Sequence, residues 1–437
     1  MNMNIKPKEA AAIINSLIGG VVPATGIQHI AVGRTEEINA ALSTMDDVKN
    51  GLSAVKFWIG DFGSGKSFML HLINTVALRQ KFVVANADFT PTNRLYSNDG
   101  KALALYTAIM DSLSIQTRPE GGALPLLLEK WIEQSISMAA EENGISPSEI
   151  REARYLDLIR YRITKNINAF TDVGGFDFSA VIIKYYEGYI NFDDKLQRDA
   201  LKWMRGEYHS KIEARQDLGV RETVSDMNYY DMLKNFCKLF VSMGYSGFMI
   251  NLDEMINLYK ISTSVMREKN YEKILTIYND CLQGKASGMF FNFAGTKEVL
   301  ENPRRGFFGY DALKTRLESN KYETQAARDF AQPVIRLMPL NHDEIFVLLQ
   351  KLSEIFNFNY KTDIEITDAE ILLFMEEMFN KPGASEFLTP REIIRNFLNI
   401  LNIVRQNPGA DKRKLFNETE ISDERPEINL PEGIEEL

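Results

Sequence analysis

The stretch from residue 54 to residue 76 constrains the fold most, because it specifies a strand, a glycine-rich loop and a helix in immediate succession. Residues 54–59 are a short apolar run typical of a buried strand, and residues 69–76 carry apolar side chains at helical spacing. The loop between them fits the pattern G-x-x-x-x-G-K-[ST]. Its eight residues are Gly60, Asp61, Phe62, Gly63, Ser64, Gly65, Lys66 and Ser67. Average residue frequencies give a chance match of roughly 1–2% in a chain of this length, so we favour a phosphate-binding loop over a flexible turn.

Each residue type in this loop has a chemical reason to be there. The glycines let backbone N–H groups turn inward around phosphate oxygens, Lys66 offers a positive charge to the outer phosphates, and Ser67 offers a hydroxyl to Mg²⁺. We therefore expect ATP and Mg²⁺ as cofactors, held by the loop and by Phe68, which follows it.

An acidic pair follows a second apolar strand pattern at residues 247–252. Asp253 is expected to hold magnesium through a water, and Glu254 to polarise the attacking water. An acidic pair at a strand end is common, so it carries weight only together with the phosphate-binding loop. A glutamate at this position favours a hydrolase over a small-molecule kinase, and the sequence predicts a Mg²⁺-dependent ATPase.

Further apolar runs predict strands at residues 82–87, 289–294 and 334–338, which together indicate an α/β fold with a parallel sheet. The run at 289–294 contains Asn292 and is followed by Thr296, and either side chain is a candidate for sensing the γ-phosphate. The alternative is an ordinary polar residue at a strand end.

Helical patterns fill the rest of the chain. We expect a helix at residues 7–18 within an N-terminal segment 1–50, a nucleotide-binding core at 51–338 with a large helical insertion at about 101–238, and a helical domain at 339–407. Capping boxes with proline at the first helical position predict helix starts at Ser146 and Thr389. Residues 411–436 hold nine acidic and four basic side chains, so 408–437 is predicted to be a mobile acidic tail.

Four arginines are candidates for contacts with phosphate. Arg391 lies in the first turn of the helix that begins after Thr389, where the helix macrodipole disfavours a cation, so we expect it to reach a bound phosphate. Arg316, and with lower preference Arg304 and Arg305, follow the fourth strand and are candidates for an arginine finger that reaches a neighbouring subunit's nucleotide. For each of them a solvated surface arginine is the alternative.

Composition excludes some classes of protein. A net charge of −10 and a pI near 5.2 argue against an overall basic nucleic-acid binder, although a local basic face stays open. The aromatic and basic side chains at 184–195 are better explained by helix packing than by single-strand binding, and Cys237 and Cys281 by core packing. No signal pattern or bilayer-length apolar run occurs, so we expect a cytoplasmic protein without membrane contact.

Taken together, these motifs resemble an AAA+ ATPase of the initiator type. Gly33 and Arg34, followed by two glutamates, resemble the box that lies against the adenine in such proteins, and the other motifs follow in that family's order. The resemblance implies an AAA+ P-loop core, a C-terminal helical lid at 339–407, and assembly into a homo-oligomer, with a ring as one form.

A narrower resemblance joins the chain to the BREX-type phage-defence P-loop ATPases of the BrxC/BrxD family, and of the two it is more similar to BrxD. It rests on residues 118–124, 202–207 and 305–317, within a match from about residue 20 to 405. It implies an ATPase of bacterial anti-phage defence that acts on DNA or on a DNA-processing partner, a helicase or nuclease. No winged-helix pattern follows residue 407, which makes the insertion the better candidate contact surface. A nucleotide-gated switch that controls a partner without acting on DNA is the alternative, and the acidic pair speaks against a scaffold with purely structural ATP.

Overall fold

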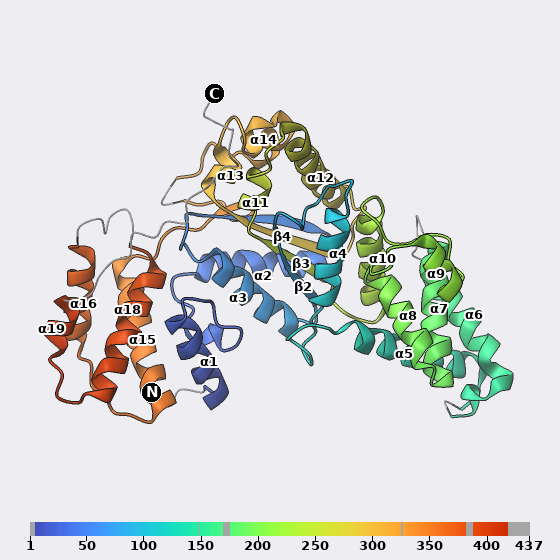
Figure 1. Cartoon of the computed structure of the whole chain (residues 1–437), viewed down its shortest axis with the longest axis horizontal. Helices are drawn as coiled ribbons and strands as arrows, with labels where there is room; N and C mark the ends of the chain where they lie inside the picture. The colour runs from blue at the N-terminus through green and yellow to red at the C-terminus, as the bar shows by residue number, and fades with distance from the viewer. Residues whose placement is uncertain (1–4, 147, 169–174, 325–326, 382–387, 418–437) are drawn as a thin grey trace.

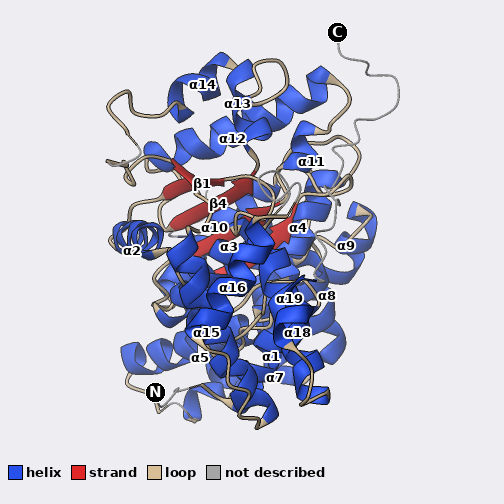
Figure 2. Ribbon diagram, turned by 90° about the vertical axis from the view of Figure 1, so that its left-hand side faces the viewer, coloured by secondary structure: helices blue, strands red, loops and turns tan. Residues whose placement is uncertain are grey.

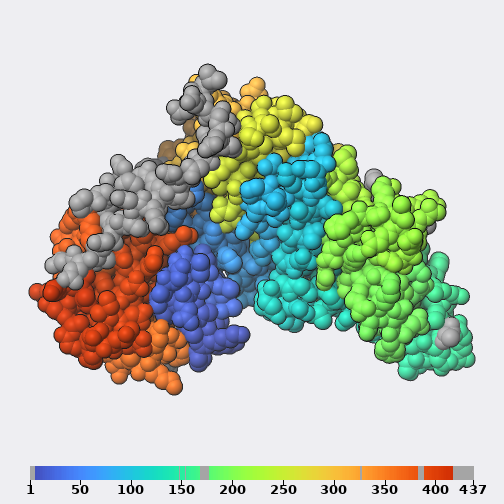
Figure 3. Space-filling model, in the orientation of Figure 1, coloured from blue at the N-terminus to red at the C-terminus, as the bar shows by residue number. Residues whose placement is uncertain are grey.

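A computed structural model describes residues 5–146, 148–168, 175–324, 327–381 and 388–417. A parallel sheet occupies the centre, a group of helices projects from one end, and a second helical unit lies at the opposite end (Figure 1). In the space-filling view the three parts form an arc whose lower edge is hollowed between α1 and the insertion (Figure 3).

The sheet has five parallel strands in the order β2-β3-β4-β1-β5, which confirms the predicted α/β class. The strands are β1 (Ala54–Ile59), β2 (Val83–Asp88), β3 (Phe248–Asp253), β4 (Met289–Gly295) and β5 (Val334–Arg336). Because all strands run the same way, their carboxyl ends meet at one edge of the sheet. The residues after β1, β3 and β4 are therefore brought together.

Helices cover both faces of the sheet, which explains why the strands are apolar almost throughout (Figure 2). Trp58, Met249 and Phe290 face α2 (Thr35–Lys49) and α3 (Lys66–Arg79). Alternate residues face the other layer, which comprises α4 (Lys101–Asp111), α10 (Tyr229–Ser242), α11 (Ile256–Tyr259), α12 (Ser264–Leu282), α13 (Lys297–Glu301) and α14 (Asp311–Leu317).

The helices that project from the core are α5 (Leu124–Asn143), α6 (Leu156–Asn168), α7 (Gly175–Asn191), α8 (Asp194–Met204) and α9 (Lys211–Leu218). The outer helices of the predicted insertion, α4 and α10, pack on β2 and β3 instead, so the projecting part is about 124–218. Tyr185 and Tyr186 are buried within it, as expected of helix packing.

The helix predicted to start at Ser146 does not form. The Ser146 hydroxyl accepts a hydrogen bond from the Glu149 N–H at 3.2 Å, but only a single 3-10 turn follows, Glu149–Arg151. Glu152 has extended backbone angles and ends the turn, so one satisfied N–H group does not propagate into a helix. Other 3-10 turns lie at Ile27–His29, Ala153–Tyr155 and Phe307–Gly309.

The C-terminal helical unit contains α15 (His342–Tyr360), α16 (Asp368–Phe379), α18 (Pro390–Gln406) and α19 (Lys412–Asn417). The N-terminal helix α1 (Pro7–Ile18) packs on α15 and α18, and its Ile13 and Ile14 lie in the same apolar core. The predicted segment 1–50 is thus divided, since α1 joins this unit whereas α2 packs on the sheet. The chain between them, residues 19–34, runs from one body to the other.

The predicted tail at 408–437 is wrong at its beginning. Residues 412–417 form α19, which packs on α16 and α18 with the Phe416 ring fully buried, while Lys412 pairs with Glu370 at 3.1 Å. Two apolar side chains, Leu415 and Phe416, and one ion pair dock a segment whose composition is otherwise that of a solvated tail. Residues 418–437 lie outside the described part of the chain.

Both cysteines are buried and free, as expected of core residues. No helix in the described part of the chain is long and apolar enough to cross a bilayer.

Candidate functional site

A cleft lies between the carboxyl edge of the sheet and the C-terminal helical unit. It encloses about 1210 Å³, including the part open to solvent. Ligand sites in proteins are concave and mostly apolar with a few polar groups, and the residues that line this cleft are of both kinds. Its polar end is lined by residues 62–68, Asp253, Glu254, Thr296 and Arg391.

The glycine-rich loop enters the cleft between β1 and α3, where the sequence predicts it. Gly63 (φ 76°) and Gly65 (φ 89°) adopt the left-handed conformation that side chains disfavour. A Cβ on Gly63 would lie 2.8 Å from the Thr389 side chain at the start of α18, so the loop touches the helical unit at this point. The N-terminus of α3 faces the cleft, which suits an anion.

Lys66 folds back over the loop. Its Nζ donates hydrogen bonds to the carbonyls of Gly60 at 3.0 Å and Asp61 at 2.8 Å. It also lies 5.5 Å from the centre of the Phe62 ring, at the mouth of the cleft. Burial lowers the pKa of Lys66, and the nearby carboxylates of Asp253 and Glu254 oppose that shift. The Lys66 ammonium group is therefore held beside the loop by hydrogen bonds to two carbonyls, and a bound anion can replace these carbonyls as the acceptor. Gly60 and Asp61, both predicted binding residues, contact Lys66 but do not line the cleft.

The acidic pair lies directly against the loop. The Ser67 hydroxyl donates a hydrogen bond to Asp253 Oδ2 at 2.6 Å, and Asp253 Oδ1 accepts one from the Glu254 N–H at 2.7 Å. Glu254 has a positive φ of 58°, which is uncommon for a residue with a side chain. Partial desolvation, together with the charge of Asp253, raises the pKa of Glu254.

A third carboxyl group, which was not predicted, lies at this edge of the sheet. Asp88 ends β2 in register with Asp253 on β3. Burial raises the pKa of Asp88, and the charge of Asp253 adds to the effect. The sequence contains a signal for this third carboxyl group, because two neighbouring parallel strands that both end in aspartate place those side chains next to each other.

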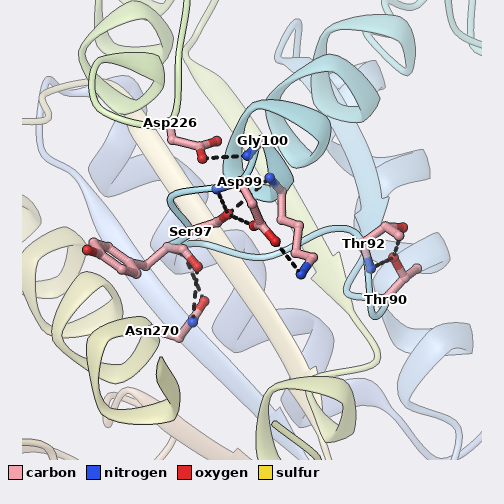
Figure 4. A network of polar contacts seen from close by, with 9 residues as sticks. Thr90, Thr92, Ser97, Asp99, Gly100, Asp226 and Asn270 are labelled. Carbon is pink, nitrogen blue, oxygen red and sulfur yellow. Dashed lines mark hydrogen bonds and ion pairs between the residues drawn. The ribbon is translucent and has the colours of Figure 1, made fainter. Parts of the chain in front are cut away.

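The loop that leads from Asp88 to α4 is polar and held by many side-chain bonds (Figure 4). Asn270 is fully buried, and its Oδ1 accepts hydrogen bonds from the N–H groups of Leu95 and Tyr96 at 3.0 and 2.9 Å. Asp226 accepts from the N–H groups of Gly100 and Leu103 at 2.8 and 2.7 Å, which caps the start of α4. These bonds hold the loop between β2 and α4 in place.

Of the two candidate sensors, only Thr296 reaches the cleft. It is 3% exposed, and its hydroxyl has no hydrogen-bond partner in the described part of the chain; the same holds for the Ser64 hydroxyl at 5% exposure. Buried hydroxyls without partners are costly, so their position in the cleft wall favours a ligand with polar atoms.

Asn292 belongs to a buried ladder across the sheet instead. Its Oδ1 accepts from Trp58 Nε1 at 3.0 Å, its Nδ2 donates to Asn251 Oδ1 at 3.0 Å, and Asn251 donates to Asn86 at 2.9 Å. It does not line the cleft. The prediction went wrong because a strand pattern shows which face a residue occupies but not how far it lies from the strand's end.

Of the two residues of the predicted base box, one lines the cleft and the other does not. Arg34 is 6% exposed, lines the cleft, and donates a hydrogen bond from Nη2 to the Ser64 carbonyl at 3.0 Å. Gly33 does not line the cleft and lies against Glu344 at the start of α15, where a Cβ would come within 2.4 Å of the carboxyl group. Both residues thus contact the loop or the helical unit.

Arg391 lines the cleft, and no ion pair or hydrogen bond of its side chain occurs within the described residues. Its charge contributes to the lowered pKa of Lys66, so the two cations lie near each other. The other arginines lie elsewhere: Arg316 donates to Asn279 and to the Ala312 carbonyl, Arg305 donates to the carbonyls of Tyr259 and Ile261, and Arg304 does not line the cleft. None of these three reaches the cleft of its own chain.

The apolar end of the cleft was not predicted. It is built by three segments that are far apart in the sequence, namely the end of α1 with the linker after it, the first turns of α15 with the residues just before them, and the first turns of α18. Its apolar residues are Leu17, Val21, Val22, Pro23, Ile30, Val32, Leu340, Leu348 and Ile394. The one available signal was a Val-Val-Pro sequence in a turn, where polar residues are usual.

Residues 5–420 match the model of the family described as BREX system ATP-binding protein BrxC/D. The match covers nearly the whole chain, and the chain belongs to this family. No curated protein matches it.

Proposed function

We propose that this member of the BREX ATP-binding protein family binds ATP with Mg²⁺ in the cleft and hydrolyses it. The observation that carries the proposal is the meeting of three groups at one end of the cleft: the glycine loop, the Ser67–Asp253 pair, and the cation of Arg391. The phosphates would lie against the backbone N–H groups of residues 63–67 and the N-terminus of α3.

The side chains fit a magnesium ion. A hydroxyl and a carboxylate that lie 2.6 Å apart are oxygen ligands of the kind Mg²⁺ prefers, and one carboxylate with phosphate oxygens and waters is a usual set. Ser67 would contact the ion directly, and Asp253 directly or through a water. When bound, Mg²⁺ neutralises charge on the phosphates.

Two cations would hold the outer phosphates. Lys66 exchanges its hydrogen bonds to the carbonyls of Gly60 and Asp61 for phosphate oxygens, and Arg391 approaches from the helical unit. Because Arg391 and the loop belong to different bodies, a bound triphosphate links the sheet to the helical unit. This gives the helical unit the role of a lid.

The apolar end of the cleft would receive the base. Its branched side chains offer a flat contact without charge, and residues 17–32 contribute most of them. We infer that the base lies against this linker rather than against Gly33, because Gly33 is turned toward Glu344.

Glu254 would accept the proton of the attacking water, and Thr296 would hold that water or the γ-phosphate through its hydroxyl, which has no partner among the described residues. A raised pKa brings a carboxylate closer to the working pH and makes it a better base. The reaction is hydrolysis of the terminal phosphoanhydride bond of ATP to ADP and phosphate.

We further place the chain in the AAA+ class and nearer to BrxD than to BrxC, acting on DNA or on a DNA-processing partner such as a helicase or nuclease in anti-phage defence. Arg316 stays the first candidate for completing a neighbour's site in an oligomer. Residues 124–218 hold 16 acidic and 13 basic side chains, which favours a protein partner for the insertion over DNA. A nucleotide-gated switch without action on DNA is the second candidate.

The test is ATP hydrolysis by the full chain, measured with Mg²⁺ and with EDTA, and with no DNA, single-stranded DNA or duplex DNA. Mass photometry with ATP reports assembly. Mg²⁺-dependent hydrolysis that DNA stimulates, in particles larger than a monomer, supports action on DNA. Slow hydrolysis by a monomer that is indifferent to DNA supports the switch, and no ATP binding would refute both.

A further inference from the structure

We propose that Glu37 and Arg328 are positioning residues for the phosphate-binding loop and that they act through Arg34. The inference rests on the ATP site proposed above and adds two residues that no motif marks for this role. It also gives Arg34 a different task, since its guanidinium holds the backbone of the loop.

The contacts form a continuous chain. Arg34 Nη2 donates to the Ser64 carbonyl at 3.0 Å, and Arg34 Nη1 lies 3.8 Å from Glu37 Oε1. Arg328 Nη1 donates to the same Glu37 oxygen at 3.1 Å. Arg328 also donates to the Arg336 carbonyl and lies 4.5 Å from the centre of the Phe330 ring. The chain thus connects the loop to the segment before β5.

The Ser64 carbonyl is the atom that decides the loop's shape. A loop that turns its N–H groups toward an anion turns its carbonyls outward, and a buried carbonyl needs a donor. Ser64 is 5% exposed and is followed by Gly65, which tolerates φ of either sign. Without the guanidinium, the peptide between these two residues is free to rotate and point its oxygen into the cleft, where it repels phosphate.

Glu37 stabilises the charge of Arg34, and Arg328 stabilises the charge of Glu37. Arg34 and Glu37 are 6% and 4% exposed, and a charge so deeply buried is costly without a partner. Burial lowers the pKa of Arg34, and the charges of Glu37 and Glu344 oppose that shift. Arg328 supplies a second cation to Glu37 and is itself fixed by a backbone carbonyl.

The experiment is an ATP titration of the full chain, at a temperature well below its melting point, with a thermal melt without nucleotide as a separate readout. Glu37→Gln is expected to raise the Kd for ATP about tenfold or more, because Arg34 loses its ion pair with Glu37. The matched control is Glu36→Gln, which removes the same charge from an exposed neighbour on the same helical turn and is expected to leave Kd within about twofold. A residue that merely stabilises the fold would lower the melting temperature and leave Kd unchanged.

A double-mutant cycle tests whether Glu37 acts through Arg34. If it does, Arg34→Ala with Glu37→Gln binds ATP no more weakly than Arg34→Ala alone. Full additivity of the two effects on Kd would overturn the proposal.

Arg328→Gln provides a second route if Glu37→Gln does not fold, since Arg328 is less buried. It is expected to raise Kd a few-fold, and Arg328→Lys to recover part of the loss. Unchanged Kd in Arg328→Gln overturns the inference while wild-type ATP binding stands. Absence of ATP binding in the wild type would instead sink the proposed function.

Discussion

The cleft edge and the helical insertion differ in whether their polar side chains have hydrogen-bond or ion-pair partners within the described residues. In the cleft, Thr296 and Ser64 have buried hydroxyls without partners within the described residues, and Arg391 has no ion pair there. In the insertion, many charged side chains pair with each other. These pairs include Arg151 with Glu133, Arg160 with Glu187, Arg162 with Glu142, Lys202 with Glu213, and Lys211 with Glu222.

This difference indicates where a polar ligand is expected to bind. Groups that lack partners in the protein gain most from a ligand, whereas a paired charge must break an existing contact to bind one. The cleft is therefore prepared for a polar ligand. In the insertion the paired charges neutralise each other, so we expect a partner to recognise the shape of this surface better than its charge. The variants below test the two regions in order of expected effect.

Glu254→Gln tests the acidic side of the cleft and has the largest expected effect. Hydrolysis should fall about 100-fold or more, because glutamine cannot accept the water's proton, while ATP binding persists. Phosphate release and an ATP titration measure the two quantities separately. Hydrolysis at the wild-type rate would mean that another group is the base.

Gly63→Ala tests the contact between the loop and the helical unit. The new methyl group would lie 2.8 Å from Thr389, so ATP affinity is expected to fall by about tenfold or more. The matched control is Gly51→Ala, which has a similar positive φ of 93° but nothing within 4 Å of the added carbon. The control should lose about 1 kcal/mol of stability from backbone strain and keep its affinity. Equal affinities in the two variants would exclude a role for this contact.

Arg391→Ala asks whether the helical unit supplies a cation to the phosphates. We expect the Kd for ATP to rise about tenfold, and the Kd for AMP, which lacks the outer phosphates, to stay nearly constant. Arg395 lies one turn further along α18 and is also exposed, so Arg395→Ala serves as the control. A similar loss of affinity for ATP and AMP would place Arg391 away from the outer phosphates.

Lys211→Ala tests the insertion and has the smallest expected effect. The Lys211–Glu222 pair is more than half exposed, and such pairs contribute about 0–1 kcal/mol to stability. Thermal melting and ATP hydrolysis should both stay close to the wild type. A clear loss of hydrolysis would show that the insertion is coupled to the cleft and that the two regions are less separate than their contacts indicate.

Much of the core could be predicted from sequence because its signals are local. The strand at Ala54–Ile59 and the helix at Pro7–Ile18 have the predicted bounds, and the glycine-rich loop lies between β1 and α3 as the pattern predicts. Thr296 and Arg391 reach the cleft because each follows a well-marked boundary, a strand end or a capped helix start.

The remaining errors share a physical cause, since they depend on which distant segments meet. Asn292 has the polarity of a sensor but finds partners in Trp58 and Asn251 on other strands. Phe416 docks a segment with the composition of a tail, and α1 joins helices that follow it by more than 300 residues. The sequence shows Glu37 only as the second of two adjacent glutamates, whereas the fold places its carboxylate between Arg34 and Arg328.

The most direct test of the account is an ATP titration by calorimetry, with Mg²⁺, on the wild type and on Lys66→Ala. The account predicts that the wild type binds one ATP per chain in a saturable manner. Removing the cation that lies over the loop should weaken binding by at least 100-fold. A wild type that takes up no ATP, or a Lys66→Ala variant that binds it equally well, would contradict the central claim.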